Sequence, residues 1–288
     1  MEEMKFNGKI PDVSVEQLRR DKNFSMSRHH FHSTYEVYYL LDGERNYFIH
    51  SRSYRIHRGS LVFIGSEQIH KTTMARTPAH ERILLEISES LVRELSEGFR
   101  PYSPEQTPFS ESSGVLELTN AEQKETEQLL FQIMREMGSK KPAYFQEIRA
   151  LLEELLIFIL RKSSLLSNNC PAICSSKHQK VNEVASYICT NFAEISSLDQ
   201  LSQHFYISKY YLCRIFKDVT GMTISQYVNA NRIKAAEKML LESSQSVIGI
   251  AAASGFESVT YFEKIFRESL GFSPVQYRKL NRNMGGRA

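Results

Sequence analysis

The sequence has no long apolar run and no apolar segment near its N-terminus. Its purest apolar stretch, residues 155–160, is far shorter than the roughly 20 residues that a membrane-spanning helix needs. Residues 1–9, MEEMKFNGK, are acidic and polar and lack the apolar region of a signal peptide. We therefore expect a cytoplasmic protein that has no membrane segment.

Cysteine is scarce as well. The four cysteines are Cys170, Cys174, Cys189 and Cys213, and their spacing matches neither a zinc-binding nor a disulfide framework. The sequence therefore predicts reduced thiols. Cys170 and Cys174 lie in residues 163–177, a segment of Ser, Asn and Pro that is typical of a linker. A redox or metal role for this cysteine pair is the alternative.

The chain has only a small excess of positive charge, and this charge is unevenly distributed along the sequence. The net charge of the 288 residues is +3. Residues 177–288 contain 14 Lys or Arg against 9 Asp or Glu, whereas residues 1–176 contain 22 against 24. This distribution favours a polyanion as the partner of the C-terminal half. The length suggests two globular domains.

The N-terminal part has the pattern of an antiparallel β domain. Within residues 24–73, short β-branched and aromatic segments alternate with turn signals, and residues 41–44 and Gly59 are the expected turns. Residues 81–88 predict a further strand, and residues 98–114 read as a loop. We expect a sandwich or barrel in residues 1–118.

Two helices are expected next, in residues 119–162. The first begins with Thr119 or Asn120 as its N-cap and ends near Gly138, and the second runs over about 143–162. The second helix has a wide apolar stripe. This stripe predicts packing on the β domain, a dimer interface, or both together.

The most informative feature is an internal repeat with an offset of 50 residues. Residues 208–227, SKYYLCRIFKDVTGMTISQY, match residues 258–277, SVTYFEKIFRESLGFSPVQY, at seven of twenty positions. In each copy a short helix, Leu198–His204 or Val247–Ala253, is followed by a turn of three or four residues. Ser208 or Ser258 then caps a second helix. This is the spacing of a helix-turn-helix unit, whose second helix reads the major groove of DNA.

A plain helical bundle is the alternative, but the charge pattern favours DNA. The second helices carry exposed cationic and hydrogen-bonding side chains, which can contact phosphates and base edges. Their apolar positions, such as Ile215 and Ile265, are expected to face the core. Residues 178–288 are therefore expected to form an all-α DNA-binding domain.

These segments resemble the AraC/XylS family of bacterial regulators over about 100 residues. The signature positions are Ile250, Ala251, Gly255, Phe256, Tyr261, Phe262, Phe266, Arg267, Gly271, Phe272, Pro274, Tyr277 and Arg278. The resemblance implies two helix-turn-helix subdomains joined by a long helix, here about Ile224–Glu242, with reading helices in two successive major grooves. It also implies that the reader residues are Ser208, Lys209, Tyr210, Cys213, Arg214, Lys217, Ser258, Val259, Thr260, Glu263 and Lys264.

Within this set, Arg214 could pair bidentately with guanine, while Lys209 and Lys217 would contact phosphate. Two positions depart from the family pattern. Tyr206 stands where glycine is common and could strain the first turn, and Ser202 stands where alanine is usual. Because Cys213 and Val259 are weak readers, specificity is expected to lean on DNA shape.

Residues 24–73 resemble the cupin-type sensor domain of many such regulators, on the pattern His30-x-His32-x3-Glu36-x6-Gly43 followed by Gly59 and His70. In metal-binding cupins the three histidines and the glutamate hold one metal ion. Gly65, Glu67 and Met74 depart from that pattern, so we expect no metal and no cofactor. The expected effector-binding residues are His30, His32, Glu36, Tyr38 and His70, whereas His50, His57 and His80 are expected at the surface.

Together these features predict an α+β protein of two domains: an N-terminal antiparallel β-barrel with helices, and a C-terminal tandem helix-turn-helix domain. The predicted function is a transcriptional regulator that responds to a small molecule such as a sugar and binds promoter DNA and RNA polymerase as a homodimer. One alternative is a metal-dependent cupin enzyme fused to DNA-binding repeats. Another is a constitutive DNA-binding protein whose barrel only dimerises.

Overall fold

The structure is a computed structural model, and it describes residues 2–22, 34–49, 51–65, 68–99, 114–165 and 175–285. The chain divides into two compact units, Met1–Cys174 and Ser175–Ala288. Each unit is described by itself below. Two helices extend into the expected linker of residues 163–177, because one ends at Leu165 and the next begins at Ser176. Cys170 and Cys174 lie outside the described residues.

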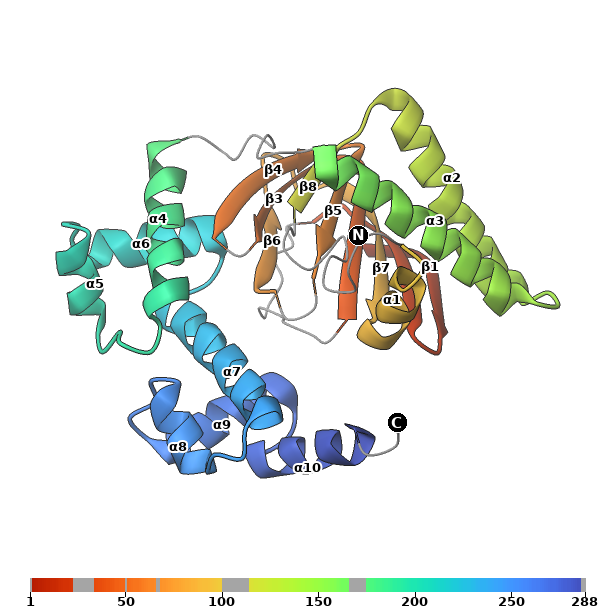
Figure 1. Cartoon of the computed structure of the whole chain (residues 1–288). Helices are drawn as coiled ribbons and strands as arrows, with labels where there is room; N and C mark the ends of the chain where they lie inside the picture. The colour runs from red at the N-terminus through yellow and green to blue at the C-terminus, as the bar shows by residue number, and fades with distance from the viewer. Residues whose placement is uncertain are drawn as a thin grey trace. The chain divides into compact units, whose positions relative to one another are not determined.

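The N-terminal unit is built on antiparallel strands. The strands are β1 (Glu2–Ile10), β2 (Val13–Arg20), β3 (Thr34–Ile49), β4 (Arg52–His57), β5 (Ser60–Ile64), β6 (His70–Met74), β7 (His80–Ser88) and β8 (Gly114–Glu117). Their main order is β1-β2-β7-β3-β5-β8, and β4 and β6 pair with the second half of β3 (Figure 1). The hairpin of β1 and β2 was not predicted, and neither was β8.

Strand β3 replaces the turn that was expected at residues 41–44, so that prediction is wrong. The chain stays extended through a β-bulge between Leu40 and Asp42, and Gly43 has a φ of 89°. A Cβ at Gly43 would lie 2.3 Å from the Ala79 oxygen. The glycine and the bulge therefore bend one strand so that its halves join two different sets of neighbours.

Both faces of the central strands are buried, and successive residues point alternately to one face and to the other. On β3, Val37 and Tyr39 belong to the cluster that also contains the helices, whereas Tyr38 and Leu40 belong to a second cluster inside the barrel. The Tyr39 hydroxyl reaches across to the helices and donates a hydrogen bond of 3.0 Å to Glu127. The strands consequently form a wall between the barrel interior and the helical layer.

Three helices cover the outer face of this wall: α1 (Glu89–Ser96), α2 (Asn120–Ser139) and α3 (Tyr144–Leu165) (Figure 1). Thr119 is the N-cap of α2 and forms a capping box with Glu122, as its sequence predicts. The apolar stripe of α3 packs in the same cluster as the sheet, and Leu152, Leu155 and Ile159 have no exposed surface. The packing interpretation is therefore confirmed. Helix α1 was not predicted.

The described residues of the C-terminal unit form helices and the turns that connect them. Its helices are α4 (Ser176–Asn191), α5 (Leu198–His204), α6 (Lys209–Thr220), α7 (Ile224–Glu242), α8 (Val247–Ala253), α9 (Val259–Leu270) and α10 (Pro274–Gly285). The expected bounds of α5, α7 and α8 are confirmed. In Figure 1, α7 joins a group made of α4, α5 and α6 to a group made of α8, α9 and α10.

These two units confirm the predicted fold class, an antiparallel sheet domain with helices followed by an all-α tandem helix-turn-helix domain. Among the described helices, none is long and apolar enough to cross a membrane.

Candidate nucleic-acid interface and effector cavity

Helix α6 divides into a buried face and an exposed face. Leu212, Ile215 and Phe216 are at most 2% exposed, and they hold the helix in the core. The expected reader residues lie on the other side. Lys209, Tyr210, Arg214 and Lys217 are exposed, and Cys213 is half-buried between the two faces. The 3.6-residue period of the sequence thus places four of these side chains where a large partner can reach them.

Arg214 is the best-organised cation on this face. Its guanidinium lies 5.3 Å from the ring centre of Tyr211 and 5.9 Å from that of Tyr210. Such cation–π contacts hold the planar group in place without using its hydrogen-bond donors. Lys209 differs, because its ammonium lies 2.9 Å from an Asp199 carboxylate oxygen. That ion pair partly neutralises Lys209.

Helix α9 repeats this division. Phe262 and Phe266 are fully buried, whereas Thr260, Glu263 and Lys264 are exposed. Val259 is half-buried. The Lys264 ammonium is 4.0 Å from Glu268, the residue one turn further along the helix.

Ser208 and Ser258 begin the two helices as N-caps. Their hydroxyls accept hydrogen bonds from the backbone of Tyr211 and Tyr261, at 3.4 and 3.3 Å. Both serines are exposed. Each side chain therefore stabilises its helix end while lying at the surface.

Arg232 of α7 links the two helix-turn-helix units. It donates hydrogen bonds to the carbonyl oxygens of Phe192 and Ile195, at 3.0 and 2.6 Å. The same guanidinium lies 5.5 Å from the ring centre of Phe256, which follows the turn of the second unit. One side chain thus contacts the segment after α4 and the turn before α9. No pattern in the sequence predicts this link, because arginine on a helix is usually a surface residue.

The N-terminal unit contains a cavity of about 70 Å³ inside the barrel. Two of the expected effector residues, Glu36 and Tyr38, line it. The remaining lining residues are Arg20, Tyr47, Thr72, His80, Arg82 and Leu84. None of these six was predicted. The alternation of His80, Arg82 and Leu84 along β7 places three of them on one face, since every second residue of a strand faces the same side, but it does not identify that face as the interior.

Glu36 is the acidic group of this cavity. It is 4% exposed, accepts a 2.8 Å hydrogen bond from the Tyr47 hydroxyl, and lies 3.3 Å from Nε2 of His70. Burial raises the pKa of Tyr47 well above its usual value, so this hydroxyl stays protonated and donates. The structure therefore brings Glu36 and His70 together. His30 and His32 lie outside the described residues, within which no group of three potential metal ligands occurs.

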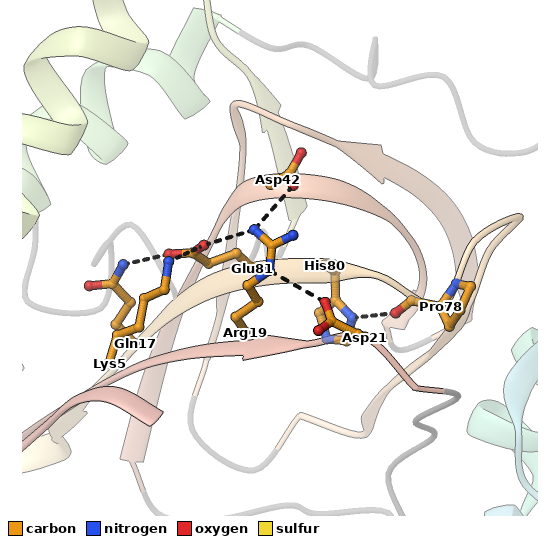
Figure 2. Close-up of polar contacts among 8 residues, drawn as sticks. All are labelled: Lys5, Gln17, Arg19, Asp21, Asp42, Pro78, His80 and Glu81. Atoms are coloured by element: carbon orange, nitrogen blue, oxygen red, sulfur yellow. Dashed lines mark hydrogen bonds and ion pairs between the residues drawn. The ribbon is translucent and has the colours of Figure 1, made fainter. Parts of the chain in front are cut away.

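The expectation that His80 lies at the surface is wrong, because it is 3% exposed and lines the cavity. Burial lowers its pKa to about 4, and the charges of Arg45, Arg20 and Arg82 act in the same direction. Its Nδ1 lies 3.0 Å from the Pro78 carbonyl oxygen, as Figure 2 shows. His57 is exposed, as expected. His50 lies outside the described residues.

The residues next to the cavity lining face the other way. Glu81 accepts hydrogen bonds of 2.6 Å from both Lys5 and Gln17, and Arg19 lies 3.6 Å away (Figure 2). Burial opposes ionisation of Glu81, but these partners outweigh it and hold its pKa below the usual value. Arg19 also lies near Asp21 and Asp42. This network joins β1, β2, β3 and β7 outside the cavity lining.

Comparison with known proteins agrees with both units. A model of the AraC-like ligand binding domain matches residues 14–156, and a model of a helix-turn-helix domain matches residues 201–280. The Melibiose operon regulatory protein of Escherichia coli (strain K12) is 24% identical over 89% of this chain and 85% of its own length. The HTH-type transcriptional activator RhaS of Klebsiella pneumoniae (strain 342) is 25% identical over 95% of this chain and 94% of its own length.

Solved structures align at low TM-scores. The apo form of ToxT from Vibrio cholerae has 12% identity and a TM-score of 0.41 over 94% of this chain and 98% of that chain. The DNA-binding domain of AdpA in complex with a target DNA has 28% identity and a TM-score of 0.35 over 37% of this chain and 96% of that chain. Because the two family models match both halves and the relatives are transcriptional regulators rather than enzymes, the chain belongs to the AraC/XylS family of transcriptional regulators, with a cupin-like ligand-binding domain ahead of its tandem helix-turn-helix domain.

Proposed function

We propose that this protein binds specific promoter DNA through α6 and α9 and regulates transcription in response to a small sugar-like effector held in the barrel. The observation that carries this proposal is the repeated pair of serine-capped helices with exposed faces that bear cations and hydrogen-bonding groups. Such faces suit the phosphates and base edges of a duplex.

The length of α7, the helix that joins the two helix-turn-helix units, supports the proposed binding to DNA. Helix α7 has 19 residues, which corresponds to a length of about 28 Å at 1.5 Å per residue. Successive major grooves on one face of DNA lie about 34 Å apart. A spacer of this length suits two reading helices that enter adjacent grooves.

The reader residues have different roles in this proposal. Arg214 reads a guanine, Lys209 and Lys217 contact phosphates, and Tyr210 adds apolar contact. The remaining contacts come from Ser208, Cys213, Ser258, Val259, Thr260, Glu263 and Lys264. Since several of these are short side chains, part of the specificity comes from the shape of the DNA.

The effector and partners follow from the barrel and the relatives. Glu36, Tyr38 and His70 would hydrogen-bond the effector, together with His30 and His32. One relative is named for a melibiose operon and another is named a transcriptional activator, which supports a sugar effector and activation through RNA polymerase. We further propose that the protein acts in the cytoplasm as a homodimer, and sedimentation equilibrium of the full chain would test the dimer.

Selection of bound sequences from a random DNA pool, followed by affinity measurements, tests the DNA-binding role. Arg214→Ala is expected to weaken binding to the selected DNA by about 1–3 kcal/mol and to relax the preference at one base pair. Lys217→Ala is the matched control, since loss of a phosphate contact weakens all sequences alike and reduces the salt dependence. Unchanged affinity of Arg214→Ala at fixed salt would contradict the assignment.

A further inference from the structure

The barrel cavity has two guanidinium groups at one end. Arg20 of β2 and Arg82 of β7 both line it, and the register pairs Arg20 with His80 and Leu18 with Arg82. Because positions two apart in a strand share a face, both arginines point to the same interior. The Arg82 guanidinium also lies 5.8 Å from the ring centre of Tyr38, another lining residue.

A third guanidinium, that of Arg45, lies near enough to Arg20 and Arg82 to interact with their charges. Arg45 has no exposed surface, and its pKa is lowered by burial and by the charges of Arg20 and Arg82. The neighbouring His80 is neutral at pH 7 because its pKa is about 4. Glu36 is the one carboxylate among the described residues that line the cavity. The lining therefore has an excess of positive charge before Arg45 is counted.

Carboxylates outside the lining hold these arginines in place. Arg82 lies 2.6 Å from Glu16, and Arg20 lies 3.1 Å from Glu2. Nη1 of Arg82 is buried, and no group in the described part of the chain accepts a hydrogen bond from it. Leaving a buried charged donor without a partner is costly, so an acceptor brought by a ligand would stabilise this arrangement.

The other end of the cavity suits hydroxyl groups. Glu36 lies four residues before Leu40, the partner of Arg82 in the register, which places the backbone positions of Glu36 and Arg82 about 13 Å apart along the strand. Glu36 is oriented by Tyr47 and His70 and can accept a hydrogen bond from a ligand hydroxyl. Its negative charge disfavours a second acid at this end.

The size of the cavity limits the ligand. Its 70 Å³ holds about five water molecules at roughly 10–15 Å³ each, which corresponds to about 150 Å³ of liquid water. That volume suits a molecule of monosaccharide size and excludes a long acyl chain.

We propose that the effector is a hydroxylated carboxylic acid of monosaccharide size, such as a hexuronate, whose carboxylate binds Arg20 and Arg82 and whose hydroxyls bind the Glu36 end. This inference rests on the proposed effector role of the barrel and makes its chemical class specific. A guanidinium pair matches a planar carboxylate, whereas a neutral sugar brings no anionic acceptor to the buried Nη1 of Arg82.

Isothermal titration of the full chain tests the inference with D-galacturonate and D-glucuronate against the neutral D-galactose and D-glucose. The uronates are expected to bind about tenfold or more tightly than the neutral hexoses, since hydrogen bonds to charged groups contribute about 1.5–3 kcal/mol. Acetate, which lacks hydroxyls, is expected to bind weakly. Added KCl is expected to weaken uronate binding and to leave hexose binding unchanged.

Arg20→Gln and Arg82→Gln, placed on different strands, are each expected to weaken uronate binding about tenfold or more and to remove the preference over hexoses. Arg19→Gln is the matched control. Arg19 neighbours Arg20 on β2 but contacts Glu81, Asp21 and Asp42 outside the lining. The Arg19→Gln variant is therefore expected to bind uronates with unchanged affinity. The measurement of uronate binding against added KCl uses the unmodified chain, so it still tests the inference if either glutamine variant fails to fold.

Several outcomes would overturn the inference. They are equal affinity for uronates and hexoses, binding of D-glucose 6-phosphate without binding of uronates, unchanged uronate affinity in Arg82→Gln, and absence of uronate binding. Binding of the selected DNA is measured in parallel. If hexoses bind as tightly as uronates, the inference fails but the proposed function stands. If the chain binds no specific DNA sequence, the proposed DNA-binding function fails, and the ligand measurements are unaffected.

Discussion

The turns of the two helix-turn-helix units share a hydrogen-bond motif but differ in length by one residue and in sequence. In both, hydrogen bonds close a Schellman motif: Ile207 donates to Ser202 in the first turn and Phe256 to Ala251 in the second. Both turns need a left-handed residue, which is Tyr206 with a φ of 53° in the first and Gly255 with a φ of 88° in the second.

The surroundings of the two turns explain the difference. Tyr206 is 96% exposed, so its side chain extends into solvent and only the backbone strain remains. A Cβ at Gly255 would lie 2.6 Å from the oxygen and 2.7 Å from the Cα of Ala193. Glycine is therefore required by packing in the second turn, whereas in the first turn it would be a matter of preference.

The largest expected effect is that of Gly255→Ala. We expect a loss of about 3 kcal/mol in the free energy of unfolding, because left-handed strain and overpacking against Ala193 add together. Gly271→Ala is the control, since Gly271 has a similar φ of 78° but has nothing within 4 Å of its added Cβ. Chemical denaturation would measure both, and equal losses would show that the contact with Ala193 has no effect.

The second-largest effect is expected at Arg232, which links the two helix-turn-helix units. Arg232→Ala removes the hydrogen bonds to Phe192 and Ile195 and the contact with Phe256. We expect a loss of about 2 kcal/mol in the free energy of unfolding, since the carbonyls lose a charged donor. We also expect weaker binding to DNA sites that span both grooves. If the Arg232→Ala variant binds a DNA site that spans both grooves with unchanged affinity, Arg232 does not set the spacing of the two reading helices.

The two reading helices are expected to contribute unequally to DNA affinity. Arg214 is held by two tyrosine rings, whereas the expected equivalent cation Lys264 lies near Glu268. We expect Lys264→Ala to cost about 1 kcal/mol of binding free energy, less than Arg214→Ala, because lysine is a more mobile point charge. Titration of labelled DNA at one salt concentration gives both values, and a larger loss for Lys264→Ala would reverse the ranking.

The smallest effect is expected at the first turn. Tyr206→Asn should raise the free energy of unfolding by about 0.5–1 kcal/mol, because asparagine tolerates the left-handed region better than tyrosine does. Tyr210→Asn is the control, since Tyr210 is also exposed at 77% but lies in a helix. A loss of stability in Tyr206→Asn would indicate that the ring makes a stabilising contact.

Local signals in the sequence predicted α5 to α9 of the C-terminal unit well, whereas α4 and α10 were not predicted. Serine or threonine N-caps and the 3.6-residue period define α5, α7 and α8, and glycines end α6 and α9. These signals depend mainly on neighbouring residues. The outward faces of α6 and α9 followed from the same period. The contact of Arg232 with Phe192 and Phe256 could not be predicted, since it joins residues that are far apart in the sequence.

The barrel was harder to predict. Residues 41–44 have the composition of a turn, yet long-range pairing with β7 keeps them extended. Strand β1 is mostly exposed and charged, so it has little of the alternation that identifies a strand. His80 and Arg82 have polar side chains that a single sequence assigns to the surface, and only the register of β7 directs them inward.

The wall formed by β3 has a consequence for how a bound molecule could be sensed. Tyr38 lines the cavity, and the next residue, Tyr39, bonds to Glu127 of α2 on the reverse side. The two side chains share one peptide unit, which is planar and stiff. A shift of the backbone at Tyr38 would therefore pass through one peptide unit to Tyr39, and through the hydrogen bond of Tyr39 with Glu127 to α2.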